Sequence, residues 1–167
     1  MTQGEPGRTA GLERFVSAQE CDYETALAEL RRGRKETCWI WYVLPQLRGL
    51  GVSGTSDRYG ISDLTEARAY MDHPVLGPRL VECTNALLES DAPSAEYVFG
   101  RLDAKKLHSS MTLFTLAAPH EQAFARVLRR YFKGRLDADT ERLLDDIAES
   151  QRGPGRSGPH PAPGQPR

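Results

Sequence analysis

Apolar residues recur every three or four positions through most of the chain, which is the period of an amphipathic helix. The clearest stripe is Phe124, Val127, Leu128, Tyr131 and Phe132, which ends at Gly134 after basic residues. A second stripe follows Pro74, a residue suited to the first helical position, and comprises Leu76, Leu80, Thr84, Leu87 and Leu88. Sustained strand alternation appears nowhere in the sequence. The pattern predicts an all-α fold: a single compact multi-helix domain of about seven to eight helices in an orthogonal, array-like arrangement.

Capping residues predict where several of these helices begin. We expect a short first helix over Leu12–Gln19 and a second that starts at Asp22 and stops at Gly33. Asp63, with Glu66 three residues later, resembles a capping box. Asp139 is the expected cap of a final helix that carries Leu143, Leu144 and Ile147.

The segment 37–45 is ambiguous, because its aromatic and β-branched residues alone are typical of a buried strand. A single strand would have no partner, since no second run of that kind exists in the sequence. We therefore interpret the segment as a buried helix that ends at Pro45.

Composition divides the chain of 167 residues into one domain with two tails. Residues 151–167 hold five prolines and four glycines, and residues 1–10 are polar, so both ends are predicted to be disordered. The helical domain is expected over residues 11–150. The whole chain is 39% hydrophobic and 27% charged, an ordinary globular balance that can support a core.

Charge and cysteine usage exclude several classes of function. The net charge is −1, and without the three arginines of the tail the rest of the chain is at −4, so no nucleic-acid partner is expected. The longest apolar run, residues 38–45, is too short to cross a bilayer, and no signal-peptide segment precedes the domain. Three widely separated cysteines favour a reducing compartment, and the expected location is the cytoplasm. The oligomeric state stays open.

The glycines of residues 49–54 formally match a dinucleotide-binding fingerprint. That motif requires a preceding strand and a following helix, whereas Pro45 precedes this segment and a polar loop follows it. The loop is more simply a flexible connector, although its glycines with Ser53 could also present backbone amides to an anion.

The stretch from Asp103 to Phe114 is the most informative for chemistry. As a helix capped by Asp103 it stacks Leu107, Met111, Phe114 and Ala118 on one face, with Lys105, Ser109, Thr112, Leu113 and Leu116 on the other. A helix that is apolar on more than one face is mostly buried, so its hydroxyls need partners. They either bond back to carbonyls four residues earlier or form the polar wall of a cleft, with Ser110 beside the cation Lys106.

Two tryptophans, Trp39 and Trp41, are either core anchors or a stacking plate for a base or sugar. The histidines show no metal-ligand spacing, and no carboxylate pair stands out as acid and base, so the sequence predicts neither a metal site nor a cofactor and exposes no catalytic constellation.

Several motifs together resemble one known family. They are Phe15-Val-x-Ala-Gln19, Tyr23-x-x-Ala-Leu27, Gly33-Arg-Lys35, Trp39-x-Trp-Tyr42, Pro45-Gln-Leu-x-Gly-Leu-Gly51, Tyr59-Gly-Ile61, Glu66-Ala-x-Ala-Tyr70, His73-Pro74, Phe99-Gly100 and Asp103-x-x-Lys106-Leu-x-Ser-Ser-x-Thr-Leu-Phe114. The sequence, from about Leu12 to Leu144, resembles bacterial domain-of-unknown-function family 1810, whose members are sometimes labelled calpastatin-like.

The resemblance implies an all-α fold, and so a helix for the aromatic segment, but no established activity. It shares polar positions that packing does not demand: Gln19, Lys35, Gln46, Ser53, Tyr59, Lys106, Ser109 and Ser110. Cys38 departs from it, since the resemblance leads us to expect histidine before the tryptophan.

Two hypotheses follow. The first is a cleft that binds, or binds and hydrolyses, an anionic nucleotide- or ADP-ribose-like molecule. Its predicted lining is Lys35, Trp39, Trp41, Gln46, Ser53, Tyr59, Lys106, Ser109 and Ser110. It requires Lys35 and Lys106 to converge in space, where without a ligand their charges would repel. The second is a non-catalytic interaction module that holds a partner segment in an apolar groove.

Overall fold

A computed structural model describes residues 11–153, and these fold into eight helices with no strand ladder among them. The helices are α2 (Glu13–Arg32), α3 (Ile40–Val43), α4 (Gly54–Arg58), α5 (Leu64–Asp72), α6 (Leu76–Glu89), α7 (Ala95–Ala117), α8 (Ala123–Phe132) and α9 (Ala138–Arg152). The predicted all-α fold is confirmed. The tails predicted to be disordered lie outside the described residues, apart from residues 151–153; α9 itself continues to Arg152.

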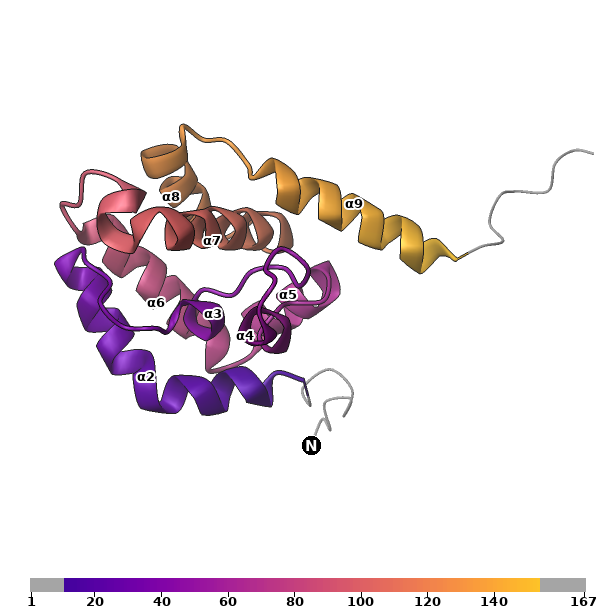
Figure 1. Cartoon of the computed structure of the whole chain (residues 1–167), viewed down its shortest axis with the longest axis horizontal. Coiled ribbons are helices and arrows are strands. Elements are labelled where there is room, and N and C mark those ends of the chain that lie inside the picture. Colours follow the sequence, from indigo (N-terminus) through magenta and orange to yellow (C-terminus); the bar gives the residue numbers. More distant parts are fainter. Residues whose placement is uncertain (1–10, 154–167) are drawn as a thin grey trace, which may run out of the picture.

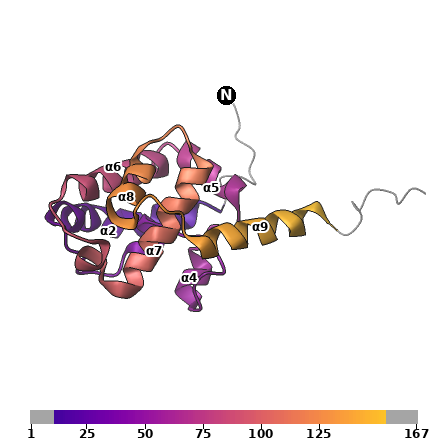
Figure 2. The ribbon, with the colours of Figure 1, turned by 90° about the horizontal axis from the view of Figure 1, so that it is seen from above.

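Long helices α2, α6, α7 and α8 form the body, and α9 reaches out to one side of it in both views (Figures 1 and 2). Helix α6 packs against α2, α5 and α8, while α7 packs against α5, α8 and α9. The short helices α3 and α4 lie in the long connection between α2 and α5.

A chain of aromatic contacts runs through the core and joins four helices. Phe15 of α2 meets Tyr70 of α5 edge-on at 5.2 Å between ring centroids, and Tyr70 meets Phe114 of α7 at 5.3 Å. Phe114 in turn lies 5.8 Å from Phe124 of α8. All four rings are fully buried, so helices distant in sequence share one apolar centre.

Two predicted helix boundaries, the start of α5 and the end of α8, are confirmed, and the predicted start of α6 is two residues too early. The Asp63 carboxylate caps α5 by accepting a hydrogen bond from the Glu66 amide at 2.8 Å. Helix α8 ends as predicted, with Lys133 and Gly134 in left-handed conformations. Pro74, however, lies in the turn before α6, which begins at Leu76.

Other predicted boundaries were wrong. There is no break at Asp22, because no helix-breaking residue interrupts α2 and the Asp22 carboxylate accepts a hydrogen bond from Tyr42 instead of capping. Asp137, not Asp139, caps α9 by accepting from the Thr140 amide at 3.1 Å. The aromatic segment is helical for only one turn, Ile40–Val43, before Pro45.

Helix α7 begins eight residues before the predicted cap at Asp103. Ser94 caps it, and the helix kinks at Gly100, whose φ of 76° and ψ of 171° are not helical. Asp103 therefore lies inside the helix, just after the kink, where its carboxylate is free to meet side chains from elsewhere. As predicted, Leu107, Met111, Phe114 and Ala118 are all buried.

Within the described residues, none of the helices has the length and apolarity needed to span a membrane.

Candidate functional site

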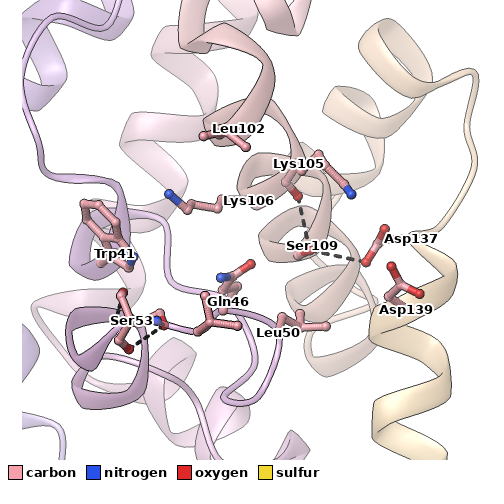
Figure 3. Close-up of a pocket in the computed structure, with 13 residues that line it drawn as sticks. Trp41, Gln46, Leu50, Ser53, Leu102, Lys105, Lys106, Ser109, Asp137 and Asp139 are labelled. Atoms are coloured by element: carbon pink, nitrogen blue, oxygen red, sulfur yellow. Dashed lines mark hydrogen bonds between the residues drawn. The ribbon is translucent and has the colours of Figure 1, made fainter.

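A pocket of about 360 Å³ opens between the loop that precedes α4, the middle of α7 and the start of α9 (Figure 3). Trp41 closes one side of it, and Asp137 and Asp139, at the start of α9, stand on the other. Its lining residues are Trp41, Gln46, Leu50, Gly51, Val52, Ser53, Ser56, Leu102, Lys105, Lys106, Ser109, Asp137 and Asp139.

The loop wall of the pocket is held by short-range bonds around α4. Ser53 and Ser56 cap each other reciprocally, since each amide donates to the other's hydroxyl at 3.1 Å. Gly51 passes so close to Ser56 that a Cβ at position 51 would lie 2.5 Å from the Ser56 side chain. The glycine-rich segment is therefore a tightly packed turn beside the pocket rather than a flexible connector, and no strand precedes it as a dinucleotide fingerprint requires.

Two lysines and one aspartate form an ion cluster behind this pocket. The Asp103 carboxylate accepts from Lys35 Nζ at 2.9 Å through one oxygen and from Lys106 Nζ at 2.8 Å through the other. The Lys35 and Lys106 side chains are 8% and 22% exposed. Burial raises the pKa of Asp103, but hydrogen bonds and charges from the two ammonium groups outweigh it and hold that pKa below its usual value. The cluster carries one unbalanced positive charge.

Lys106 and Trp41 meet at the edge of the pocket. Lys106 Nζ lies 4.2 Å from the centroid of the Trp41 ring, a cation–π distance. The indole Nε1 of Trp41 is buried and has no hydrogen-bond acceptor among the described residues. An unpaired buried donor costs on the order of 1–3 kcal/mol. A ligand that placed an acceptor atom beside this N–H would remove that cost.

Carboxylates stand at the opposite end, at the start of α9. Asp137 Oδ2 accepts from Ser109 Oγ at 3.2 Å, from the Thr140 amide at 3.1 Å and from Thr140 Oγ1 at 2.6 Å. Asp137 Oδ1 has only His108 Nδ1 near it, at 3.9 Å. Asp139 is mostly exposed and pairs with Arg142 at 3.5 Å. The pocket thus has Lys106 beside Trp41 on one side and two carboxylates on the other, with Lys105 extending toward the carboxylates (Figure 3).

Five of the nine residues predicted from sequence line this pocket: Trp41, Gln46, Ser53, Lys106 and Ser109. Ser109 also shows the back-bonding alternative, since its hydroxyl donates to the Lys105 carbonyl at 3.1 Å. Lys35 is not in the lining, but it converges with Lys106 as expected. The predicted repulsion between the two lysines did not include Asp103, whose carboxylate pairs with both ammonium groups.

The other three predicted residues lie outside the pocket. Trp39 is a core residue whose indole donates to Glu29 Oε1 at 3.1 Å, so it offers no stacking plate. Tyr59 packs against the rings of Phe15 and Tyr42. Ser110 is fully buried, and its hydroxyl has no partner among the described residues.

Sequence reasoning missed several lining residues and one buried carboxylate. Lys105 shares a predicted helix face with Ser109 but was not among the predicted site residues. Asp137 and Asp139 had no signal, because exposed charges at helix ends are common. Glu29 could have been found, since it follows Ala26 by three positions on the buried face of α2. Its carboxylate accepts from the Thr37 amide at 2.9 Å as well as from Trp39, and these bonds fix the segment that carries Lys35.

No group of three metal-ligating side chains occurs within residues 11–153. The search of curated proteins finds no match to this chain.

The family described as "Protein of unknown function (DUF1810)" matches residues 9–144. This chain belongs to the DUF1810 family. A similar solved structure is that of the conserved hypothetical protein Rv1873 from Mycobacterium tuberculosis, with 49% sequence identity and a TM-score of 0.79. The similarity covers 80% of this chain and 96% of Rv1873. The DUF1810 match includes the whole pocket, because every lining residue lies between positions 41 and 139.

Proposed function

We propose that this DUF1810 domain binds a small anionic molecule of the nucleotide or ADP-ribose type in the pocket beside Trp41 and Lys106. The observation that carries the proposal is the ion cluster, in which two ammonium groups share the single carboxylate of Asp103. The excess positive charge is partly shielded from water, where an ion interacts more strongly with a counter-charge than it does in bulk solvent. An anion docked on Lys106 would balance it.

Further features of the pocket support an oxygen-rich ligand. The unpaired indole N–H of Trp41 could donate to a ligand oxygen, and Gln46 and Ser53 add polar side chains to the same lining. The volume of about 360 Å³ lies at the small end of the roughly 300–1,000 Å³ typical of small-molecule sites. This size favours the smaller members of the ligand class, such as a mononucleotide.

A second candidate is the interaction module, favoured by the apolar residues Val52 and Leu102, which stand exposed at the rim of the pocket. An apolar groove for a partner would leave the neighbouring lysines in solvent. Lys35 and Lys106 instead turn inward to Asp103, which supports the small-ligand proposal over this one.

The test is a thermal-shift and calorimetry screen of nucleoside monophosphates, ADP-ribose and inorganic phosphate. A ligand at 100 times its Kd adds about 2.7 kcal/mol to stability and should raise Tm by several degrees. Lys106→Gln should abolish the shift and still fold, because Lys35 continues to pair with Asp103. Arg68→Gln removes the same charge at an exposed position outside the pocket and should keep the shift.

Two outcomes would overturn the proposal: no compound in the screen raises Tm, or Lys106→Gln responds as the unchanged protein does. Chromatography of the same mixtures for released base or phosphate tests hydrolysis separately.

A further inference from the structure

We infer that the ligand of this pocket is bipolar, with its anionic group against Lys106 and Trp41 and a hydroxyl-bearing, sugar-like part against Asp137 and Asp139. The inference rests on the proposed function and adds which chemical class of anion the pocket selects. It comes from the distribution of charge around one cavity, in which Lys106 extends toward Trp41 on one side while Asp137 and Asp139 stand on the other (Figure 3). Lys105 extends toward the two aspartates.

The anion-binding end lies just beyond the kink of α7. Lys105 and Lys106 are neighbours on this helix and both line the cavity, but their side chains extend in opposite directions, and only Lys106 extends toward Trp41 (Figure 3). Lys106 shares Asp103 with Lys35, so only part of its charge is balanced. The unpaired Trp41 N–H adds a neutral donor at this end. Donors alone point to a phosphate-like or carboxylate group.

The opposite end offers acceptors. Asp137 places all three of its hydrogen bonds on Oδ2, which leaves Oδ1 with no hydrogen-bond donor among the described residues. Asp139 has only a long, exposed contact with Arg142. Ionised carboxylates accept hydrogen bonds and cannot donate them, so a ligand must bring donors here. The hydroxyls of a sugar provide donors on neighbouring carbons.

This polarity excludes a polyanion as the preferred ligand. A triphosphate long enough to fill the cavity would place negative charge beside Asp137 and Asp139, where like charges repel. A sugar monophosphate or nucleoside monophosphate carries its charge at one end only, which matches the arrangement of the lining.

The experiment compares three probes by calorimetry on the full chain: adenosine 5′-monophosphate, its 2′,3′-dideoxy analogue and tripolyphosphate. We expect the monophosphate to bind at least tenfold more tightly than either of the others. Asp139→Asn should lower that preference, because it should weaken binding of the monophosphate and strengthen binding of tripolyphosphate severalfold. Asp137→Asn should act in the same direction and still fold, because asparagine also caps helices well. Asp145→Asn, an exposed change on α9 outside the pocket, is the charge-matched control and should alter nothing.

Equal affinity for the monophosphate and its dideoxy analogue, with no effect of Asp139→Asn, would overturn the inference and leave the lysine-dependent site standing. If tripolyphosphate binds most tightly in a Lys106-dependent manner, the site is a general anion site and the bipolar ligand is wrong. If none of the three binds, the inference falls, and the screen described above then decides whether the proposed function falls as well.

Discussion

Replacing Asp103 by asparagine should destabilise the fold and strengthen anion binding at the same time. The aspartate accepts from Lys106 through Oδ1 and from Lys35 through Oδ2. Asparagine keeps the shape but offers only one acceptor oxygen, so its amide group would face an ammonium group as donor against donor. Two lysines would then share no counter-charge, and an anionic ligand would supply the missing one.

The magnitude follows from burial. Removing one partner of a buried ion pair costs about 3–5 kcal/mol, and because Lys106 keeps some exposure we expect about 2–4 kcal/mol here. Asp103 would also repel a ligand anion bound to Lys106. At a separation of about 6 Å and an effective dielectric constant of about 20–40, that repulsion is roughly 1–3 kcal/mol, so the substitution should tighten anion binding about 10- to 100-fold.

The stability effect should depend on pH in a defined direction. Burial raises the pKa of Asp103, but its bonds to Lys106 and Lys35 lower the pKa below the ordinary value by a greater amount. The stabilisation is therefore complete above the unfolded pKa of about 3.9 and is lost as pH falls through the lower folded pKa. The difference between the unchanged protein and Asp103→Asn should narrow in that acidic range.

Urea denaturation at several pH values measures the loss of folding stability, and calorimetry with a nucleoside monophosphate measures the gain in anion affinity. Asp145→Asn controls for loss of a surface charge. A change of less than about 0.5 kcal/mol in the free energy of unfolding of Asp103→Asn, the usual range for a surface substitution, would contradict a structural role for this ion cluster. Weaker anion binding in a variant that remains folded would contradict the expected relief of repulsion.

Three further changes test the packing. Phe124→Ala should cost about 3–5 kcal/mol in chemical denaturation, because the ring is fully buried; a loss under about 1 kcal/mol would contradict the core described here. Gly77→Ala should cost about 1–3 kcal/mol, since a Cβ there would lie 2.1 Å from the Met71 carbonyl oxygen; an unchanged Tm would argue against this close approach. Glu29→Ala should cost about 3–5 kcal/mol, because buried donors such as the Trp39 indole would lose their acceptor. Glu29→Gln keeps an acceptor oxygen and should cost less than half of that. Equal losses in the two variants would contradict this role of Glu29.

The helical period predicted the fold well because it reports on burial directly. Phe124, Val127 and Leu128 are buried on one face of α8, as their spacing requires. Boundaries were less predictable, because a capping residue acts only where the backbone already leaves the helix. Asp22 has the chemistry of a cap but lies in the middle of a helix, and its carboxylate bonds to Tyr42 instead.

The candidate site could be predicted only in part, for a similar reason. Residue type pointed to Lys106, Trp41 and Ser109, but nothing in the sequence showed that Lys35 would reach the same carboxylate from 68 positions away. The negative end of the pocket depends on how the start of α9 packs beside α7, which is a tertiary contact that no local pattern encodes.

A crystal structure with a nucleoside monophosphate at saturating concentration tests the central claim most directly. The account predicts phosphate oxygens within hydrogen-bond distance of Lys106 Nζ and a ligand acceptor about 3 Å from Trp41 Nε1. An empty pocket in a crystal with its opening accessible to solvent, or a nucleotide bound at another surface, would contradict it.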